Sequence, residues 1–421
     1  MFEIKNHLSV ENNNLFIGKK QAKKLIESYG SPLFVINEER VRENFIRYKK
    51  AFPNADLYYA AKANGNITIL KIMAELGAGA DVFSDGELYM AHLAGIPKNK
   101  ILFNGNSKTD AELLMAVETG VRVSIDSINE LRALNEIAKA NGKIVDIAFR
   151  VNPDVSPDTH PYISTGLKTS KFGIPHDEIL SVYKEAKELE NVNPVGIHCH
   201  IGSQILNLSP FGDAMHKMMD KVQEISNIGI KLEFVDIGSG LGVPYVKGEK
   251  ETTPLDLANI VLPIFDAKCK ELGINPKLVL EPGRYIMADA SILLATVNTM
   301  KETVKKFVGI DVGFNLLIRP AMYDSYHYIV VANKASEKAK ETYTIVGPIC
   351  ETGDIIAKDR ELPIIEKGDI IAILDAGAYG FSMSSQYNGR TRCAEILING
   401  EKIDIIRMKE SYSDLLANQI I

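Results

Sequence analysis

Lys62 is the first residue whose position suggests chemistry. It follows the strand-like run 57–61 (Leu-Tyr-Tyr-Ala-Ala) and precedes two turn formers, Asn64 and Gly65. A lone lysine at the end of a strand commonly extends its ammonium group into water. A partly desolvated lysine can instead form a Schiff base with an aldehyde. The residues that lie near Lys62 in the fold decide between these interpretations.

Polar residues follow eight predicted strands at the same point. In chain order they are Lys62; Ser84 with Glu87; Asn104; Asp126; Arg150; His200 with Gly202 and Ser203; Gly238, Ser239 and Gly240; and Glu281 with Arg284. The carboxyl ends of parallel strands form the face where barrel enzymes carry out their chemistry. Loop composition would explain one such residue, but it does not explain eight in phase.

Two motifs resemble a metal site and a nucleotide site, but their residue spacing does not match either kind of site. His198 and His200 in "HCHIGSQ" share a strand face, as a zinc pair would, but no third ligand follows at a usable spacing, so no metal is expected. The motif "DIGSGLG" (236–242) has the spacing G-x-G-x-G, whereas a dinucleotide fingerprint has G-x-G-x-x-G. Its glycines still allow backbone N–H groups to approach a phosphate.

The remaining candidates each have a structural and a chemical interpretation. Glu281 and Arg284 in "EPGRY" form either a surface ion pair or part of a site, and Cys350 in "GPICETGD" is either an inert buried thiol or a reactive one. Glu281 can keep a pyridine nitrogen protonated, and the imidazole of His200 can stack on a ring. With Lys62 and the glycine turns, these groups meet the requirements of pyridoxal phosphate.

The elements that must position these residues alternate in type. Amphipathic segments such as 67–77 and 128–142, which end in glycine, predict helices. The predicted strands are the Val-, Ile- and Phe-rich runs at 56–60, 79–83, 101–104, 121–125, 145–151, 195–201, 233–238 and 277–282. This alternation indicates a parallel sheet, and eight strands favour a (β/α)8 barrel over a doubly wound open sheet.

After about residue 285 the pattern changes to long apolar runs interrupted by Gly, Pro and Asp. This pattern predicts an all-β domain of hairpins, built as a β-sandwich or β-barrel. The start of the chain is also strand-like at 1–10 and 13–17. We therefore predict an N-terminal strand and helix (1–30) that join the C-terminal domain, a cofactor-binding barrel (31–285) and a C-terminal β domain (286–421).

Composition excludes several classes of protein. The 421 residues are 46% hydrophobic and 24% charged, which indicates a globular chain of two or three domains. A net charge of −6 without a basic tract argues against nucleic acid as a partner. The chain lacks a signal-peptide pattern and any apolar run near the ~18 residues of a membrane span. Its four cysteines do not form a disulfide framework. We expect a soluble, cytoplasmic protein.

The chain resembles the diaminopimelate decarboxylase family. The motifs that carry this resemblance are "YYAAKAN", "SDGE", "SKFG", "HCHIGSQ", "DIGSGLG", "EPGRY", "RPAMYDSYH", "GPICETGD", "DAGAYG" and "YNGRTR", in the family's order from about residue 30 to 410. The family belongs to the fold-type III pyridoxal-phosphate decarboxylases, with ornithine and arginine decarboxylases, and is related to alanine racemase. The resemblance implies the architecture predicted above.

The resemblance also implies roles for individual residues. Lys62 would bind the aldehyde of the cofactor, His200 would lie against its ring, and Glu281 would pair with the pyridinium nitrogen. Cys350 would protonate the carbanion that remains after carbon dioxide leaves. Cys350 and Glu351 would come from the partner subunit of a homodimer with shared active sites. Further cofactor contacts, mostly to the phosphate, would come from Ser84, Ser203, Gly238, Gly240, Gly283, Arg284 and Tyr379.

The predicted substrate is meso-2,6-diaminopimelate, which would be decarboxylated to L-lysine and carbon dioxide in the last step of lysine biosynthesis. Arg284 and Arg319 suit its distal carboxylate. Hydroxyls would come from Tyr323 and Tyr379, and the ammonium would be bound by Glu351. Decarboxylases that act on D-ornithine, D-lysine, L-ornithine or arginine share much of this signature and are the alternatives.

Two positions depart from the family's common pattern. Thr352 replaces a serine but keeps its hydroxyl, whereas Asp324 replaces a small residue and bears on the choice of substrate. A non-catalytic pyridoxal-phosphate-binding homologue is a second alternative. Such a homologue would be expected to have lost Lys62, Cys350 or the glycines of the phosphate loop, and all are present. The Cys-Glu pair and the long β domain disfavour a racemase.

Overall fold

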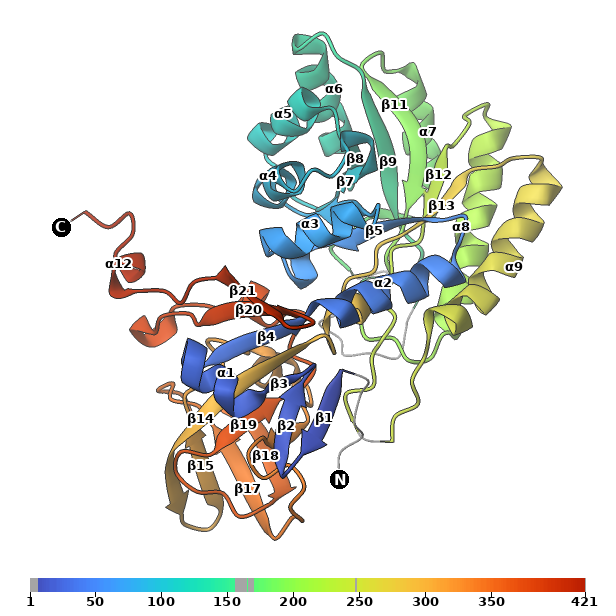
Figure 1. Ribbon diagram of the computed structural model, residues 1–421. Helices are drawn as coiled ribbons and strands as arrows, with labels where there is room; N and C mark the ends of the chain where they lie inside the picture. Colours follow the sequence, from blue (N-terminus) through green and yellow to red (C-terminus); the bar gives the residue numbers. More distant parts are fainter. Residues whose placement is uncertain (1–6, 156–164, 166–169, 247, 421) are drawn as a thin grey trace. The chain divides into compact units, whose positions relative to one another are not determined.

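The computed structural model describes residues 7–155, 165, 170–246 and 248–420. The chain divides into two compact units, whose helices and strands are labelled in Figure 1. The barrel unit comprises Phe45–Val243 and Glu251–Tyr285. The sheet unit comprises Met1–Asn44, Pro244–Lys250 and Ile286–Ile421.

Eight parallel strands of the described residues close into a barrel. They are β5 (Asp56–Ala60), β6 (Gly79–Val82), β7 (Ile101–Phe103), β8 (Arg122–Ile125), β9 (Val145–Asn152), β11 (Val192–His198), β12 (Phe234–Asp236) and β13 (Lys277–Leu280). The hydrogen-bonded order is β9-β11-β12-β13-β5-β6-β7-β8, and β8 pairs with β9 to close the ring. The short strand β10 (Ile174–Pro175) also pairs with β9. The predicted barrel and its eight strands are confirmed.

Helices follow these strands along the chain, and five of them begin after a residue whose side chain caps the first turn. They are α3 (Ile67–Glu75), α4 (Asp85–Leu93), α5 (Asp110–Thr119), α6 (Ile128–Ala140), α7 (Ile179–Glu188), α8 (Ser209–Asn227) and α9 (Pro254–Leu272). The side chains of Asn66, Ser84, Thr109, Ser127 and Thr253 accept N–H groups of the first turn of the helix that each precedes. These bonds satisfy donors that a helix leaves unpaired, so the sequence fixes where these five helices begin.

Large side chains fill part of the barrel interior opposite glycines. Tyr58 and Phe234 belong to a buried cluster in the barrel unit. A Cβ atom at Gly79 would lie 2.4 Å from the Tyr58 ring, and one at Gly196 would lie 2.2 Å from the Phe234 ring. Only glycine therefore fits at these two strand positions, because the rings pack directly on the neighbouring backbone.

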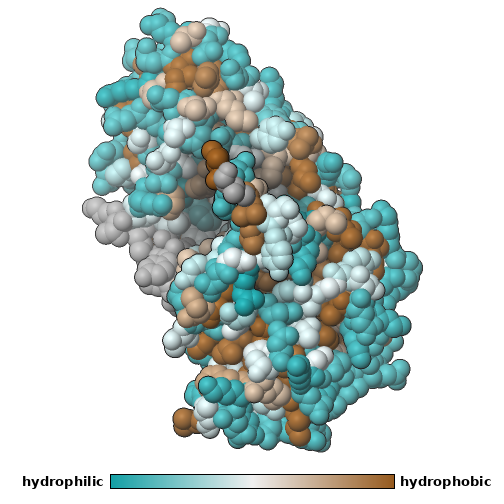
Figure 2. Space-filling view, turned by 90° about the vertical axis from the view of Figure 1, so that its left-hand side faces the viewer, coloured by the Kyte–Doolittle hydropathy of each residue, from teal (hydrophilic) through white to brown (hydrophobic). Residues whose placement is uncertain are grey.

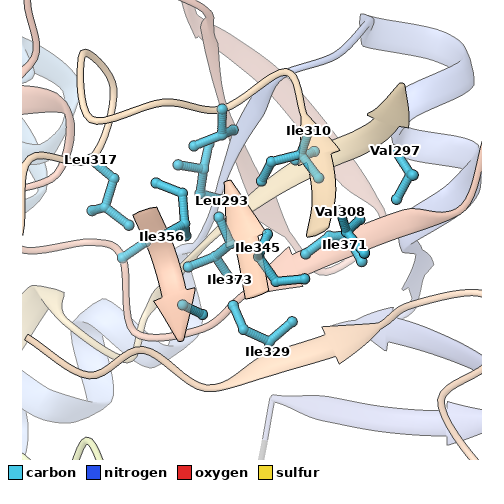
Figure 3. Packing of buried hydrophobic residues seen from close by; sticks show 14 of the residues in the cluster. Leu293, Val297, Val308, Ile310, Leu317, Ile329, Ile345, Ile356, Ile371 and Ile373 are labelled. Carbon is cyan, nitrogen blue, oxygen red and sulfur yellow. The ribbon is translucent and has the colours of Figure 1, made fainter. Parts of the chain in front are cut away.

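The sheet unit is built on a nine-stranded sheet of described residues with the order β18-β17-β15-β14-β4-β20-β21; β19 pairs with β14 and β16. Its strands are β4 (Leu33–Asn37), β14 (Ser291–Glu302), β15 (Lys306–Ile310), β16 (Ile329–Val331), β17 (Glu341–Val346), β18 (Ile355–Leu362), β19 (Ile370–Ile373), β20 (Ala394–Asn399) and β21 (Lys402–Arg407). A second sheet joins β1 (Leu8–Glu11), β2 (Asn14–Ile17) and β3 (Lys20–Gln21). Both faces of β14 are buried in its N-terminal part: Leu293 and Val297 belong to the cluster in Figure 3, whereas Ile292 and Leu294 belong to another.

The boundary between the units differs from the predicted limit near residue 30. Strand β4, which follows α1 (Ala22–Tyr29), is buried along its whole length between β14 and β20. The sheet unit therefore extends to Asn44, within α2 (Glu38–Ala51), because the apolar run of β4 is buried by pairing there. The predicted N-terminal strands are β1 and β2; residues 1–6 of the first predicted run lie outside the described part of the chain.

None of the helices in the described part of the chain is long and apolar enough to span a membrane. On the face shown in Figure 2, hydrophobic residues are interspersed among hydrophilic ones.

Candidate active site

Lys62 lies in a short 3-10 turn, η1 (Ala61–Ala63), directly after β5. Its ammonium group is paired with the carboxylate of Asp81, which lies in β6 and is fully buried. The ammonium also lies 4.7 Å from the centre of the Phe83 ring. The Lys62 side chain is only 31% exposed. Lys62 is therefore bound at the end of the barrel and does not simply extend into water, which favours the chemical interpretation.

Asn104 connects Asp81 to a second buried carboxylate, Glu281. The Asn104 side chain follows β7, and its Nδ2 donates to Asp81 Oδ1 at 2.7 Å and to Glu281 Oε1 at 2.8 Å. All three residues are buried. One amide thus holds two carboxylates from β6 and from the end of β13 in a fixed arrangement.

Glu281 also contacts an imidazole on its other side. His198 Nε2 lies 3.5 Å from Glu281 Oε2, and its Nδ1 is hydrogen bonded to Ser124 Oγ at 2.9 Å. Burial by itself would raise the pKa of Glu281, but His198 and Lys62 outweigh it and hold that pKa well below its usual range. Glu281 is therefore ionised, as a partner of a pyridinium nitrogen must be.

Asp236, at the end of β12, behaves in the opposite way. Burial and the negative charge of Glu281 raise the pKa of Asp236 well above its usual range. Asp236 Oδ1 accepts a hydrogen bond from the N–H of Gly238 at 2.7 Å. The site therefore contains one ionised and one protonated carboxyl group on neighbouring strands.

His200 lies beside the glycine loop that follows β12. The N–H of Ser239 is 3.4 Å from His200 Nδ1, and a Cβ atom on Gly238 would lie 2.6 Å from the same nitrogen. Burial, together with the nearby positive charges of Lys62 and Arg150, lowers the pKa of His200 well below its usual range. His200 is thus a neutral ring, which suits a stacking contact better than a charged one.

The predicted phosphate residues Ser203, Gly238, Gly240, Gly283 and Arg284 lie in the barrel unit, whereas Tyr379 lies in the sheet unit. Gly238 and Gly240 have positive φ angles of 62° and 132°, and a Cβ atom at Gly240 would lie 2.2 Å from the carbonyl oxygen of Gly202. Arg284 donates from Nε and Nη2 to the hydroxyl of Ser203 at 3.0 and 2.9 Å. The N–H of Gly238 is already bound to Asp236, so a phosphate would meet other donors of this loop.

Gly283 makes a similarly close approach to the turn that carries Lys62. A Cβ atom at Gly283 would lie 2.9 Å from the Cβ atom of Ala60 and 3.0 Å from that of Ala63. The segment after β13 therefore packs directly on the segment after β5.

Other predicted strand-end residues have structural partners. Ser84 caps α4 by accepting from the N–H of Glu87 at 3.2 Å, and Glu87 accepts from the N–H of Phe83 at 2.7 Å. Asp126 accepts from the N–H of Gly173 at 3.0 Å. The contact of Ser84 with a cofactor stays a prediction.

Arg319 and Tyr323 lie in the sheet unit, at the two ends of α11 (Arg319–Tyr323). Arg319 Nη1 is 3.1 Å from His327 Nε2, and its guanidinium lies 4.6 Å from the centre of the Tyr245 ring. Tyr379, in the same unit, has a positive φ of 58°.

Asp324, the departure noted in the sequence, is paired with Lys358 at 3.1 Å, and its side chain is 85% exposed. This ion pair gives the Asp324 carboxylate a partner within the sheet unit.

Cys350 and Glu351 lie in an exposed turn after β17. The N–H of Cys350 donates to Asn388 Oδ1 at 2.9 Å, and Asn388 Nδ2 donates to Cys350 Sγ at 3.3 Å. The hydroxyl of Tyr387 donates to Glu351 Oε1 at 2.8 Å. Cys350 is exposed, which excludes the interpretation of this thiol as a buried inert one.

Three groups of the site were not among the predicted site residues: Asp81, Asp236 and His198, the last weighed only as a zinc ligand. Each lies within a strand or at its last residue, whereas the prediction considered the residues that follow a strand. The strands of a parallel barrel are normally apolar, and a buried charge requires partners. An acidic residue within the strand-like run "GADVF" was therefore the sequence signal that could have identified Asp81. The fold also brings Asp236 and Glu281 near His198, with ligand atoms within 4.8 Å of one another. His198 therefore has no further ligand nearby in the sequence, but it has two carboxyl groups nearby in the structure.

The polar groups at this end of the barrel fit a pyridoxal phosphate. Of the buried side-chain atoms that have no hydrogen-bond partner among the described residues, four belong to this site: Asn104 Oδ1, Arg150 Nη1, His198 Nε2 and Asp236 Oδ2. Buried polar groups normally have such partners, so these atoms indicate that a polar group binds here. A lysine amine, an ionised carboxylate, a neutral imidazole and a glycine loop are the donor set that this cofactor requires.

Comparison with known proteins identifies the family. Residues 38–288 match the family described as "Pyridoxal-dependent decarboxylase, pyridoxal binding domain". The chain is 54% identical over 395 residues to a diaminopimelate decarboxylase of Archaeoglobus fulgidus, and the alignment covers 94% of each chain. The chain belongs to the diaminopimelate decarboxylase family of pyridoxal-dependent decarboxylases.

Solved structures of this family have the same fold as the chain. The diaminopimelate decarboxylase of Methanocaldococcus jannaschii in complex with L-lysine matches with a TM-score of 0.94 and 43% identity, over 99% of this chain and 98% of that one. The enzyme of Helicobacter pylori, also complexed with L-lysine, matches with a TM-score of 0.89 and 37% identity, over 94% and 98%. The predicted family and its pyridoxal cofactor are confirmed, whereas the roles of individual residues stay predictions.

Proposed function

We propose that the chain decarboxylates meso-2,6-diaminopimelate to L-lysine and carbon dioxide, with pyridoxal phosphate as cofactor. The observation that carries this proposal is the arrangement of Lys62, Asp81, Asn104 and Glu281 at the end of the barrel, with Glu281 held ionised. When bound, pyridoxal phosphate supplies an electron sink for the electron pair of the bond between Cα and the carboxylate.

The barrel unit would hold the cofactor at several points. Lys62 would bind the aldehyde and return to Asp81 when the substrate amine displaces it. Glu281 would keep the pyridine nitrogen protonated, since its own pKa lies well below its usual range. His200 would lie against the ring as a neutral imidazole. The phosphate would be bound by Ser203, by the backbone around Gly238, Gly240, Gly283 and Arg284, and by Tyr379 of the sheet unit.

Cys350 would deliver the proton that completes the reaction. The Cα–carboxylate bond breaks, carbon dioxide leaves, and the proton of the Cys350 thiol passes to Cα. The thiolate would then regain a proton from water. We infer that Cys350 and Glu351 act in the barrel of a partner subunit, so that a homodimer shares its sites; the exposure of both residues supports this inference.

The distal end of the substrate would be recognised by charge. Arg284 and Arg319 would bind its carboxylate, because a guanidinium matches a carboxylate with two parallel N–H groups. Tyr323 and Tyr379 would add hydroxyls, and Glu351 would accept from the distal ammonium.

The first test is carbon dioxide release by the purified, cofactor-loaded protein. The substrates are meso-diaminopimelate, L-ornithine, L-arginine, L-lysine, D-ornithine and D-lysine, offered in parallel. We expect release with diaminopimelate alone and L-lysine as the product. Preference for a diamino acid without a distal carboxylate would keep the cofactor chemistry but overturn the roles of Arg284, Arg319 and Glu351.

Two variants test the residues and the dimer together. Lys62→Ala should abolish turnover, and full turnover with the cofactor present would refute its role. Cys350→Ala should slow proton delivery and divert product towards transamination. Lys62→Ala alone should be inactive and Cys350→Ala alone slow, but a mixture refolded together should recover decarboxylation, up to about a quarter of the native activity, if each site combines both chains. No recovery would contradict the shared site, as would sedimentation as a monomer.

The cytoplasmic location predicted from the sequence belongs to this proposal as well. Fractionation of the cells that produce the protein would test it, because recovery outside the cytoplasmic fraction would contradict it.

A further inference from the structure

The motif "YNGRTR" has no role in the reaction described so far, although part of it binds the turn that carries Cys350. The side chain of Asn388 makes two hydrogen bonds to this one residue: Oδ1 accepts from the Cys350 N–H at 2.9 Å, and Nδ2 donates to the sulfur at 3.3 Å. Asn388 has a φ of 58°, in the left-handed region that asparagine tolerates better than most residues. Its amide is thus held towards the backbone and the thiol of Cys350 at once.

Tyr387 supports the same turn from the other side. Its hydroxyl donates to Glu351 Oε1 at 2.8 Å and lies 3.9 Å from Cys350 Sγ. Its ring stacks on Phe314 with the centroids 5.8 Å apart and an angle of 16° between the planes. The hydrogen bonds to Glu351 and Cys350 raise the pKa of Tyr387 to about 12, so the hydroxyl keeps its proton and acts as a donor.

We propose that Asn388 is a positioning residue that fixes the rotamer of Cys350 and supplies the N–H donor that its sulfur needs when it gives up a proton. The proposal rests on the proposed function, in which Cys350 is the proton donor. As the S–H bond breaks and the proton passes to Cα, the sulfur becomes negative. A donor that already points at the sulfur stabilises this charge without rearrangement, because hydrogen bonds to ionised groups are the stronger ones.

Other groups near this turn set the background for its titration. The titratable and charged groups around it are Glu351, Asp354, Tyr387 and Arg390. Substitution of Asn388 leaves all of them in place. A changed profile in Asn388→Ala would therefore report the loss of the amide itself, whereas Asn388→Asp also places a carboxylate beside the sulfur.

The thiol can be followed directly, because Cys350 is exposed whereas Cys199, Cys269 and Cys393 are buried. The experiment measures the rate of alkylation by iodoacetamide from pH 6 to pH 10 in the cofactor-loaded protein, with the modified residue identified by mass spectrometry. Asn388→Asp keeps the acceptor for the Cys350 N–H but replaces the N–H donor with a carboxylate oxygen. We expect the midpoint of the profile to rise by about one pH unit, which is about a tenfold lower rate near pH 7. Asn388→Ala, which removes both the N–H donor and the acceptor without adding a charge, should shift it less.

Asn418→Asp is the matched control, because Asn418 is also exposed and has a φ of 66°. Its profile should coincide with that of the unmodified protein. A profile of Asn388→Asp that also coincides, with the variant folded and cofactor bound, would overturn the proposal. So would an equal distribution of decarboxylation and transamination products in Asn388→Asp and the unmodified protein.

The Cys350→Ala variant separates failure of this proposal from failure of the proposed function. Normal product distribution in Cys350→Ala would remove Cys350 as the proton donor, whatever the alkylation profiles show. A changed distribution in Cys350→Ala with unchanged alkylation in Asn388→Asp would keep that role and overturn only the positioning by Asn388.

Discussion

Replacement of Asn104 by alanine should destabilise the protein through the two buried carboxylates that its amide connects. Asn104 Nδ2 lies 2.7 Å from Asp81 Oδ1 and 2.8 Å from Glu281 Oε1, and all three residues are buried. A hydrogen bond to a charged group contributes roughly 1.5–3 kcal/mol, so two such bonds give roughly 3–6 kcal/mol. Asp81 keeps its pairing with Lys62, and water can enter the space left by the amide. We therefore expect a loss at the lower end, about 3 kcal/mol.

The assay is thermal unfolding of the cofactor-free protein at pH 7, followed by calorimetry. For a domain of this size 1 kcal/mol corresponds to about 2–4 °C in Tm, so Asn104→Ala should lower Tm by about 6–12 °C. Its affinity for pyridoxal phosphate should also fall, because Glu281 loses the group that orients it. Asn141→Ala is the control: Asn141 is exposed and its amide bonds to the carbonyl of Ile137 at 2.8 Å, so its Tm should change little. A change below about 2 °C in Asn104→Ala, with unchanged cofactor affinity, would refute the reasoning.

Asn104→Asp tests the same arrangement by replacing the amide with a carboxyl group of nearly the same size and shape. A third carboxylate between Asp81 and Glu281 would have its folded-state pKa raised by burial and by its neighbours. A raised carboxyl pKa gives stability at low pH that is lost as the pH rises through that pKa. The deficit of this variant relative to the native protein should therefore be larger at pH 8 than at pH 5.

Three further predictions concern other residues of the barrel unit. Lys108→Ala should lower the free energy of unfolding, measured in urea, by about 3–5 kcal/mol, because it leaves the partner carboxylate of Glu130, 2.6 Å away, buried and unpaired. The double variant Lys108→Met with Glu130→Gln should recover most of this loss. No recovery would contradict the explanation. Asp236→Asn should stabilise the protein more at pH 9 than at pH 5, because the raised pKa of Asp236 makes the native carboxyl group less favourable for folding as the pH rises. An equal change in the free energy of unfolding at both pH values would contradict the raised pKa. Gly240→Ala should weaken the retention of pyridoxal phosphate on dialysis, because its Cβ would clash with a backbone oxygen 2.2 Å away; Gly142→Ala, with a φ of 61° and no atom within 4 Å, should retain the cofactor.

The barrel could be predicted from the sequence for a local reason. The strands of a closed parallel barrel are buried on both faces, so they occur as short apolar runs separated by amphipathic helices. The helices begin at Asn, Ser or Thr residues that cap them locally. Both signals lie within a few residues of each other along the chain, and the eight predicted strands are confirmed on this basis.

The position of β4 could not be predicted in the same way. Its run Leu33–Asn37 is as apolar as a barrel strand, and its sequence does not indicate which sheet receives it. Only the fold decides, since β4 pairs with β14 and β20, which lie more than 250 residues further along the chain. Pairing of this kind depends on contacts that a local pattern does not record.

The sequence by itself determined the kinds of chemical group at the site. A lysine, an imidazole, glycines and a carboxylate follow successive strands, and the barrel geometry requires strand ends to meet on one face. The sequence also determined the family, because the motifs occur in order along most of the chain.

The tertiary structure decided the charge state of these groups. Glu281 and Asp236 are both carboxyl groups at the ends of neighbouring strands, yet the pKa of Glu281 is lowered and that of Asp236 is raised. The difference arises because His198 and Lys62 act on Glu281 through space, while Asp236 faces the resulting negative charge in a buried environment. A pKa depends on distances between residues from different strands, and these distances exist only once the barrel has closed.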